Sequence, residues 1–261
     1  MIDSIYPILA FADNYIWAIS AAADNRLCVV DPGDANPVIE YAEANNRIIT
    51  DIFVTHHHPD HTGGLARLIE KYTPRIIGPA GSNIKGITQF VAEGDQVNLF
   101  DLDFTIMEVP GHTLDHIAFY QAGNDKTAPI LFCGDTLFAA GCGRLFEGTP
   151  AQMQISLTKL KSLPETTRVY CTHEYTLSNL RFAQAADPTN NKLLERIKIE
   201  TLKRQSHQPT LPSSIKLEIE TNPFLRCTEP NLIESAAAQL ERNPTTEVEV
   251  FAALRSWKDR F

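Results

Sequence analysis

The chain has 261 residues, of which 43% are hydrophobic and 21% are charged, as is ordinary for a globular protein that buries a core. It carries 23 Lys and Arg against 32 Asp and Glu, which gives a formal net charge of −9. An acidic chain repels nucleic acid and anionic membranes unless it has a local basic patch, so we expect neither partner.

The cysteines and the apolar runs bear on the cellular location. The chain has five cysteines and no CxxC pair, which favours reduced thiols over a disulfide framework. The apolar N-terminal run is interrupted by Asp13 and Asn14 and is not typical of a signal peptide. No run reaches the roughly 18 apolar residues of a membrane helix. We therefore predict a cytoplasmic protein, and we expect it to be a monomer.

Up to about residue 175, short runs rich in Val, Ile and Phe alternate with turn residues. These runs predict strands at 26–31, 51–55, 75–79, 104–110, 116–121, 129–135 and 167–173. Helical spacing occurs between them at 36–46, 65–72 and 150–163. This mixture indicates sheets covered by helices.

After about residue 175 the pattern becomes helical. The predicted helices are 177–187, 191–207, 234–243 and 246–261, with a Pro-containing stretch around Pro209 and Pro212. We therefore assign the chain to the α/β (α+β) class with two domains. Residues 1–174 are predicted to form an α/β domain, and residues 175–261 a small helical domain.

Four predicted strands end in residue types that bind metals. They lead into the run 56–61 (HHHPDH), into His112, into Asp135 and into His173. Imidazole and carboxylate suit zinc, and also iron or manganese. Six or seven such ligands exceed the needs of one tetrahedral ion and match two ions that share a carboxylate. A chance His-rich turn is the alternative, and the repetition at separate strand ends disfavours it.

The residues at these strand ends resemble a known signature. THHHPDH (55–61) resembles the THxHxDH motif of the metallo-β-lactamase superfamily. Its later motifs are similar to PGHT (110–113), GDTLF (134–138) and THEYT (172–176), and its early Asp-bearing turn is similar to VDPG (30–33). The resemblance implies an αβ/βα sandwich with the site at one edge of the two sheets.

The resemblance also implies a ligand set for two divalent ions, with zinc preferred and iron or manganese as alternatives. The first ion takes His56, His58 and His112, the second takes Asp60, His61 and His173, and Asp135 bridges both. Asp60, His61 and Asp135 are then the expected catalytic residues. His57 falls between ligand positions and is expected to point away, and His116 is expected to support the ligands from behind.

Further segments resemble one family within the superfamily, the hydroxyacylglutathione hydrolases (glyoxalase II), most closely the bacterial members. They are DNYIW (13–17), GCGRLFEGT (141–149), THEYTLSNLRFA (172–183), TNPFLR (221–226) and LRSWKDRF (254–261), so the likeness covers nearly the whole chain. It implies hydrolysis of the thioester of S-(2-hydroxyacyl)glutathione, with S-D-lactoylglutathione expected, to glutathione and a 2-hydroxy acid, D-lactate. This reaction is the second step of the glyoxalase pathway that detoxifies methylglyoxal. A hydroxide that bridges the metals is expected to attack the thioester.

Glutathione has two carboxylates and one ammonium, so it calls for cationic donors. The family implies contacts at Arg144, Phe146, Tyr175, Arg255 and Lys258. From spacing alone, a solvated helical face is the favoured interpretation of Arg255 and Lys258, and core packing fits Tyr175 about as well as a binding role. The family resemblance reverses the preference for Arg255 and Lys258. Some relatives have Lys in place of Arg144, some have Tyr in place of Phe146, and Gly is usual at Asp115.

Other functions remain open at this stage. A lactonase or a general thioesterase is the nearest alternative, and a sulfur dioxygenase would use a single iron. A nuclease is disfavoured by the net charge of −9. A non-enzymatic binding module with structural metals is disfavoured because structural zinc sites favour cysteine ligands, which this set lacks.

Overall fold

The computed structural model describes residues 1–124 and 127–261. These residues divide into two compact units. Unit 1 comprises Met1–Glu108 and Asp115–Gly134, and unit 2 comprises Val109–Leu114 and Asp135–Phe261. The domain boundary that the sequence predicts, between residues 174 and 175, lies inside unit 2 and stays a prediction.

Unit 1 contains the strands of a six-stranded sheet and those of an antiparallel meander. The six-stranded sheet consists of β1 (Ile2–Ala10), β2 (Asn14–Ala21), β3 (Arg26–Val30), β4 (Ile48–Phe53), β5 (Arg75–Pro79) and β6 (Gln89–Val91), in that order. The meander consists of β7 (Gln96–Leu99), β8 (Leu102–Glu108), β9 (Ile117–Gln121) and β10 (Ile130–Gly134). The helices of unit 1 are α1 (Ala35–Ala44), α2 (Pro59–Thr62) and α3 (Leu65–Tyr72).

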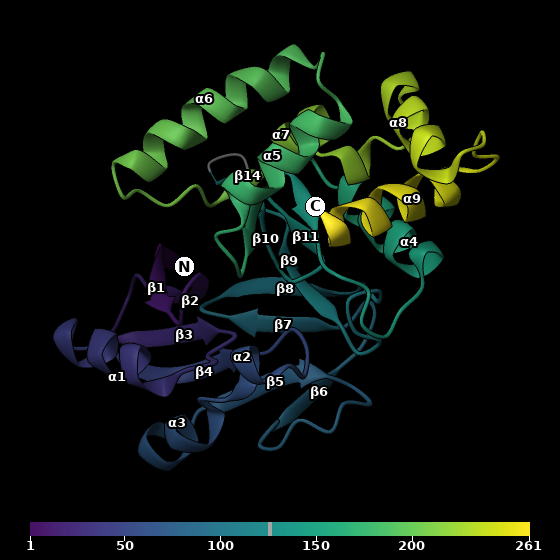
Figure 1. The fold of residues 1–261 in the computed structure, drawn as a ribbon. Helices are drawn as coiled ribbons and strands as arrows, with labels where there is room; N and C mark the ends of the chain where they lie inside the picture. Colours follow the sequence, from purple (N-terminus) through teal and green to yellow (C-terminus); the bar gives the residue numbers. More distant parts are fainter. Residues whose placement is uncertain (125–126) are drawn as a thin grey trace. The chain divides into compact units, whose positions relative to one another are not determined.

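The middle of the first sheet decides where functional residues can gather. Strands β3, β4 and β5 are parallel, so their carboxyl ends lie at one edge. The connections run through α1 and through α2 and α3, and α1 and α3 lie side by side on the sheet (Figure 1). Their apolar sides, including Val38 and Leu68, are fully buried in the core against strands such as β4. Asp31 follows β3 and the 54–61 loop follows β4, at this shared edge.

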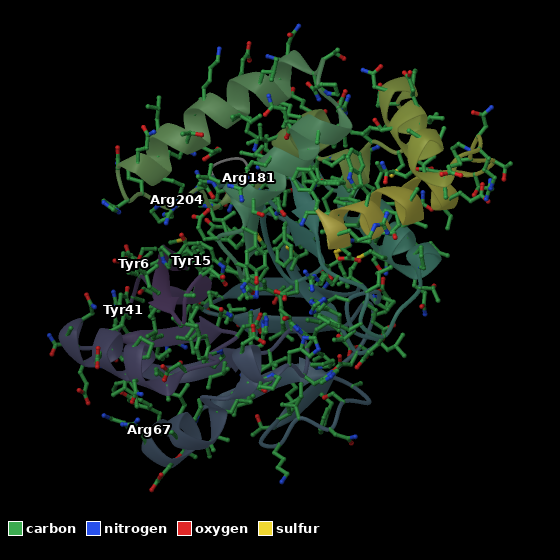
Figure 2. The ribbon with its side chains drawn as sticks, in the orientation of Figure 1. Tyr6, Tyr15, Tyr41, Arg67, Arg181 and Arg204 are labelled. Atoms are coloured by element: carbon green, nitrogen blue, oxygen red, sulfur yellow. The ribbon has the colours of Figure 1, made fainter. Side chains whose placement is uncertain are left out.

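Aromatic contacts join the layers of unit 1. The Phe53 ring of β4 stacks on Phe119 of β9 at 4.2 Å and meets the edge of Phe104 of β8 at 5.4 Å. The two sheets therefore pack face to face. At the outer edge, Tyr6 of β1 stacks on Tyr41 of α1 at 5.2 Å, and both are labelled in Figure 2.

Unit 2 is mainly helical. Its helices are α4 (Pro150–Lys161), α5 (Thr176–Ala186), α6 (Asn191–Gln205), α7 (Ile215–Thr221), the 3-10 turn η1 (Pro223–Leu225), α8 (Pro230–Leu240) and α9 (Glu247–Arg260). Its strands are β11 (Leu137–Phe138), β12 (Gly141–Cys142), β13 (Arg168–Cys171) and β14 (Ser213–Ser214). Phe182 lies at the centre of the helical core, where its ring contacts Phe224, Trp257 and Phe261.

The strands and helices predicted from periodicity are confirmed, with ends that differ by up to a few residues. The chain also forms elements that periodicity did not predict, namely β1, β2, β6, β7, β11, β12, β14, α2, α7 and η1. All five cysteines are buried thiols. Among residues 1–124 and 127–261, no helix is long and apolar enough to cross a membrane.

Candidate metal centre

Unit 1 contributes a ligand-bearing loop that starts where β4 ends. His56 and His61 are fully buried, and His58 and Asp60 are partly exposed. Proline at position 59 opens the short helix α2, so Asp60 and His61 lie in its single turn. His56 Nε2 lies 3.1 Å from His58 Nδ1, and His61 Nε2 lies 3.4 Å from Asp60 Oδ2. The loop thus brings two pairs of ligand atoms close together.

Neighbouring residues of unit 1 fix the orientation of these ligands. Asp31 accepts hydrogen bonds from the backbone N–H and the hydroxyl of Thr55, both at 2.8 Å. Asp31 also lies 3.0 Å from His61 Nδ1, and the other ring nitrogen of His61, Nε2, faces Asp60. Asn14 Nδ2 donates to Asp60 Oδ2 at 3.1 Å. Contacts of this kind hold a ligand ring in one tautomer and one orientation.

The two remaining histidines near this loop have different surroundings. The His116 ring stacks on His56 at 4.5 Å with 16° between the planes, so it supports that ligand from behind. His57 Nδ1 lies 2.9 Å from Asp115 Oδ1. Asp115, the residue that departs from the family pattern, therefore pairs with His57.

Unit 2 contributes His112, Asp135 and His173, all buried. Asp135 Oδ2 lies 3.5 Å from His112 Nε2 and 3.3 Å from His173 Nε2. His112 is oriented through its other nitrogen, because Nδ1 lies 2.8 Å from the carbonyl oxygen of Arg144. Gly143 permits this close approach, since a Cβ there would lie 2.0 Å from the Asp135 carbonyl oxygen. One carboxylate oxygen thus faces two imidazoles.

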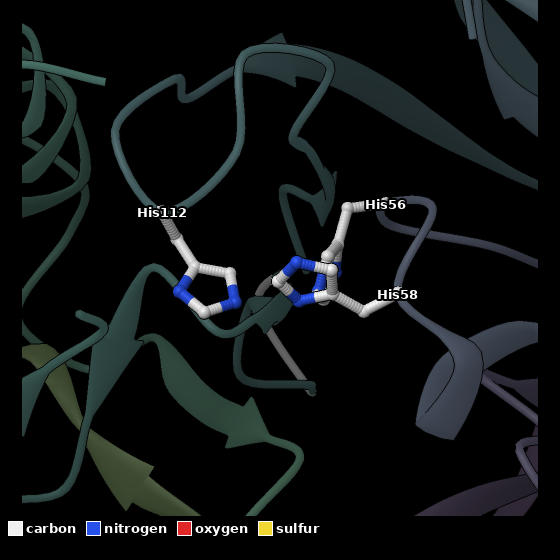
Figure 3. Close-up of side chains that lie close together, drawn as sticks. All are labelled: His56, His58 and His112. Carbon is white, nitrogen blue, oxygen red and sulfur yellow. The ribbon is translucent and has the colours of Figure 1, made fainter. Parts of the chain in front are cut away.

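The separations between candidate ligand atoms fit the chemistry of a metal site. They are 3.1 Å for His56–His58, 3.4 Å for Asp60–His61, 3.5 Å for His112–Asp135 and 3.3 Å for Asp135–His173. Ligands bonded at about 2.1 Å around a tetrahedral ion are separated from one another by about 3.4 Å. In each of three groups of residues, the ligand atoms lie within 4.8 Å of one another. The groups are His56–His58–His112, His56–His61–Asp135 and Asp60–His61–His173. Figure 3 shows the first group. Imidazole and carboxylate donors in this arrangement suit divalent metal ions.

Three of the predicted glutathione contacts lie in unit 2 with exposed side chains. The Arg144 side chain is 65% exposed and Phe146 is 62% exposed. The Phe146 ring meets the His112 ring edge-on at 5.3 Å. Tyr175 is 37% exposed, and its ring stacks on His173 at 4.6 Å. Two of these side chains therefore touch ligand histidines and also reach solvent.

The two C-terminal cations of α9 have different environments. Arg255 is buried, and it donates to the Cys142 carbonyl oxygen at 2.8 Å and to Asp259 at 3.0 Å. Lys258 is half-buried, and desolvation together with the nearby Arg255 charge lowers its pKa from 10.5 to about 8. Asp259 also lies 3.6 Å from Arg144, so it connects the two arginines. A cluster of positive charge thus surrounds one exposed carboxylate.

Two further residues hold candidate ligands in place. Asp31 and Asn14 lie in motifs that were recognised, VDPG and DNYIW, but their contacts with His61 and Asp60 come only from the structure.

Comparison with known proteins agrees with this geometry. Residues 14–173 match the family model described as metallo-beta-lactamase superfamily, and residues 174–261 match the model described as hydroxyacylglutathione hydrolase C-terminus. A hydroxyacylglutathione hydrolase of Pseudomonas paraeruginosa is 53% identical over 97% of both chains. A hydroxyacylglutathione hydrolase of Chromohalobacter salexigens is 50% identical over 99% of both chains.

Solved structures support the fold. ETHE1 from Myxococcus xanthus superposes with a TM-score of 0.66 at 21% identity, covering 98% of both chains. TTHA1623, solved in a di-iron-bound form, superposes with a TM-score of 0.58 at 24% identity, covering 84% of this chain and all of that one. The chain has the metallo-β-lactamase fold with a helical C-terminal part, as predicted. With relatives this similar along its whole length, it belongs to the hydroxyacylglutathione hydrolase family of the metallo-β-lactamase superfamily.

Proposed function

We propose that this chain hydrolyses the thioester of S-(2-hydroxyacyl)glutathione, with S-D-lactoylglutathione as substrate, to glutathione and D-lactate. This is the second step of the glyoxalase pathway for methylglyoxal. The observation that carries the proposal is that His and Asp side chains lie at the spacing of metal ligands. Arg144 and Tyr175 lie in the segments that follow Asp135 and His173, and the Tyr175 ring stacks on His173. Relatives that share half of the residues over the whole length carry the name of this activity.

The ligand groups support a centre of two divalent ions. One ion would be held by His56, His58 and His112, the other by Asp60, His61 and His173, with Asp135 shared. We propose zinc, with iron or manganese as alternatives that the same donors accept. When bound, two such ions lower the pKa of water towards neutrality and attract the charge that develops on a carbonyl oxygen.

The chain's own residues then orient the reactants. Asp60 is held by Asn14 through one carboxylate oxygen and can accept a hydrogen bond from the attacking water, which fixes the direction of its lone pair. The leaving group is a thiol with a pKa of about 8.5, so it departs as thiolate without a general acid. Burial of His56, His61, His112 and His173 limits the access of bulk water to these side chains.

Recognition of glutathione is assigned to unit 2. Arg144 and Lys258 offer charges to the glutathione carboxylates, Tyr175 offers a hydroxyl, and Phe146 offers an apolar face. We also retain Arg255 as a contact, although its N–H groups already bind Cys142 and Asp259. On this view residues 175–261 serve as the glutathione-binding domain. We further propose that the protein is cytoplasmic, because buried thiols suit a reducing compartment. We also propose that it is a monomer.

The test is a substrate panel on the purified, metal-loaded protein. We expect hydrolysis of S-D-lactoylglutathione with kcat/KM at least about 100-fold above that for a lactone, a β-lactam or RNA. Preferential hydrolysis of the lactone would identify a lactonase. Equal rates for thioesters with and without glutathione would identify a general thioesterase and would overturn the proposal.

A further inference from the structure

A short hairpin connects the proposed metal ligand Asp135 to the proposed substrate contact Arg144. It pairs Leu137 with Cys142 and Phe138 with Gly141 across a two-residue turn, Ala139–Ala140. Ala140 has a φ of +55°, a left-handed conformation that favours glycine. The backbone of this hairpin therefore needs support from outside the turn.

The support comes from buried polar side chains of α5, α7 and the residue after α7. Glu218 accepts from the Ala140 backbone N–H at 2.8 Å. Asn222 donates to the carbonyl oxygens of Phe138 at 3.2 Å and Gly141 at 2.9 Å. Asn179 donates to the Ala139 carbonyl oxygen at 2.9 Å. Four backbone groups of the hairpin are thus bound by side chains at least 40 positions away.

The key member of this network is a buried ion pair. Arg196 Nη2 lies 2.7 Å from Glu218 Oε1, and both side chains are almost completely buried. Asn222 donates to the other oxygen of Glu218 at 3.0 Å. A buried ion pair contributes little net stability compared with apolar side chains of similar volume. What it supplies is a fixed geometry, because each partner must keep its hydrogen bonds.

The hairpin in turn contacts residues assigned to the site. The Phe138 ring meets the His173 ring edge-on at 5.8 Å and the Tyr175 ring edge-on at 5.4 Å. The Cys142 carbonyl oxygen accepts from Arg255 at 2.8 Å. Bound metal would hold His173 in place directly, whereas Tyr175 and Arg255 are not proposed ligands and are positioned by side-chain contacts, of which those with the hairpin are a part.

We propose that Glu218, with Arg196 and Asn222, is a positioning residue for glutathione binding: it fixes the 137–142 hairpin, and the hairpin fixes Tyr175 and Arg255. The inference rests on the proposed function. It predicts that disturbing the network weakens binding of the glutathione part and leaves the metal ligands intact. The effect therefore falls on KM, because these contacts are made equally in the ground state and the transition state.

The test compares Glu218→Gln with Asp187→Asn. Asp187 is also a buried carboxylate of unit 2, and it binds Arg226, Asn190 and Asn231 but makes none of the hairpin contacts described above. For Glu218→Gln we expect KM for S-D-lactoylglutathione to rise about tenfold, kcat to change less than about threefold, and bound metal to stay unchanged. For Asp187→Asn we expect a lower melting temperature with an unchanged KM.

A second variant, Asn222→Ser, distinguishes the loss of the hairpin contacts from a failure of the protein to fold. Serine can still accept the hydrogen bond that Asn222 accepts from the Phe224 backbone N–H, but it removes the amide that binds the hairpin carbonyl groups. It should raise KM in the same direction. Equal KM values in the Glu218 and Asp187 variants, loss of metal in the Glu218 variant, or failure of both network variants to fold would overturn the inference. Absence of hydrolysis in the wild type would instead overturn the proposed function.

Discussion

The ligand loop at residues 54–61 and the hairpin at residues 137–142 are held in place by different means. The loop follows a buried strand, and its main support, Asp31, follows the neighbouring parallel strand. The hairpin is held by side chains such as Glu218, 78 positions from Ala140. The sheet therefore positions the proposed metal ligands of unit 1, and helices of unit 2 position the proposed substrate contacts. Metal affinity and substrate affinity should accordingly respond to different substitutions.

The largest expected effect comes from Asp135→Asn. Asp135 faces both His112 and His173 through one carboxylate oxygen, so the loss of its charge removes the shared ligand. We expect kcat/KM to fall by at least about 1,000-fold together with bound metal, measured by steady-state kinetics and elemental analysis. The matched control is Asp115→Asn, which disturbs the pair with His57 and should change kcat by less than about threefold. Wild-type activity in a metal-depleted Asp135→Asn protein would refute this assignment.

A smaller effect is expected for Asp31→Asn, which changes the support of the loop and leaves every ligand present. Asn tolerates the left-handed φ of +53° at this position, so the backbone should be unaffected. Loss of the charge beside His61 Nδ1 should lower metal affinity about 10- to 100-fold, measured by competition with a chelator. KM of the fully loaded variant should match the wild type. A raised KM at full metal loading would mean that the two regions are not separable in this way.

Lys258→Met tests the proposed substrate contacts through the pH dependence of kcat/KM. Its pKa of about 8 means that the lysine loses its charge as pH rises above 8. We expect kcat/KM for S-D-lactoylglutathione to decline above pH 8 in the wild type, and this decline to be absent in the variant. At pH 7 the variant's KM should be about three- to tenfold higher. Identical pH profiles for the two proteins would exclude Lys258 from substrate binding.

The same substitution has a consequence for stability. The pKa of Lys258 in the folded chain lies below its ordinary value of 10.5. Between about pH 8 and 10.5 the unfolded chain therefore binds more protons than the folded chain, so stability rises with pH. Below that window, the charged Lys258 lowers the stability of the folded chain. Lys258→Met should therefore raise the free energy of unfolding at pH 7 by about 1–2 kcal/mol. The gain should shrink as pH rises through the window. Denaturant titrations at pH 7 and pH 10 measure the difference, and a gain that grows with pH would contradict the assigned cause.

The smallest effect is expected for Ala140→Gly in the hairpin. Glycine adopts the φ of +55° without steric cost and keeps the N–H that binds Glu218. The free energy of unfolding should rise by about 0.5–1 kcal/mol, measured by denaturant titration. Kinetic constants should not change. A raised KM would show that a rigid turn matters in addition to the Glu218 contact.

The sequence predicted the features that depend on neighbours in the chain. Alternating or continuous apolar runs located strands such as β4 and β5, and periodic apolar residues located helices such as α3. The N-terminal strands were missed for opposite reasons. β1 is an edge strand in which only Ile8 and Ala10 are buried, and β2 is buried along its whole length, so neither has a simple alternation.

The residues of the site also differ in whether a short stretch of sequence or a contact distant in the sequence indicates their role. His56 to His61 form one short motif, so their spacing alone indicated a metal. The short helix α7 has buried Glu218 and Thr221 where an apolar pattern would be expected, and its function depends on a hairpin far away in the sequence. Likewise, no spacing rule indicates that Arg255 is buried against the Cys142 carbonyl oxygen. Such contacts become visible only in three dimensions.

The most direct test of the central claim is a metal titration of the chelator-treated, full-length protein. Zinc is added in steps, and bound metal and hydrolysis of S-D-lactoylglutathione are followed together. With the donor groups His56–His58–His112 and Asp60–His61–His173, we predict that full activity requires two ions per chain. Full activity without metal, or binding and activity that both saturate at one ion, would contradict the account.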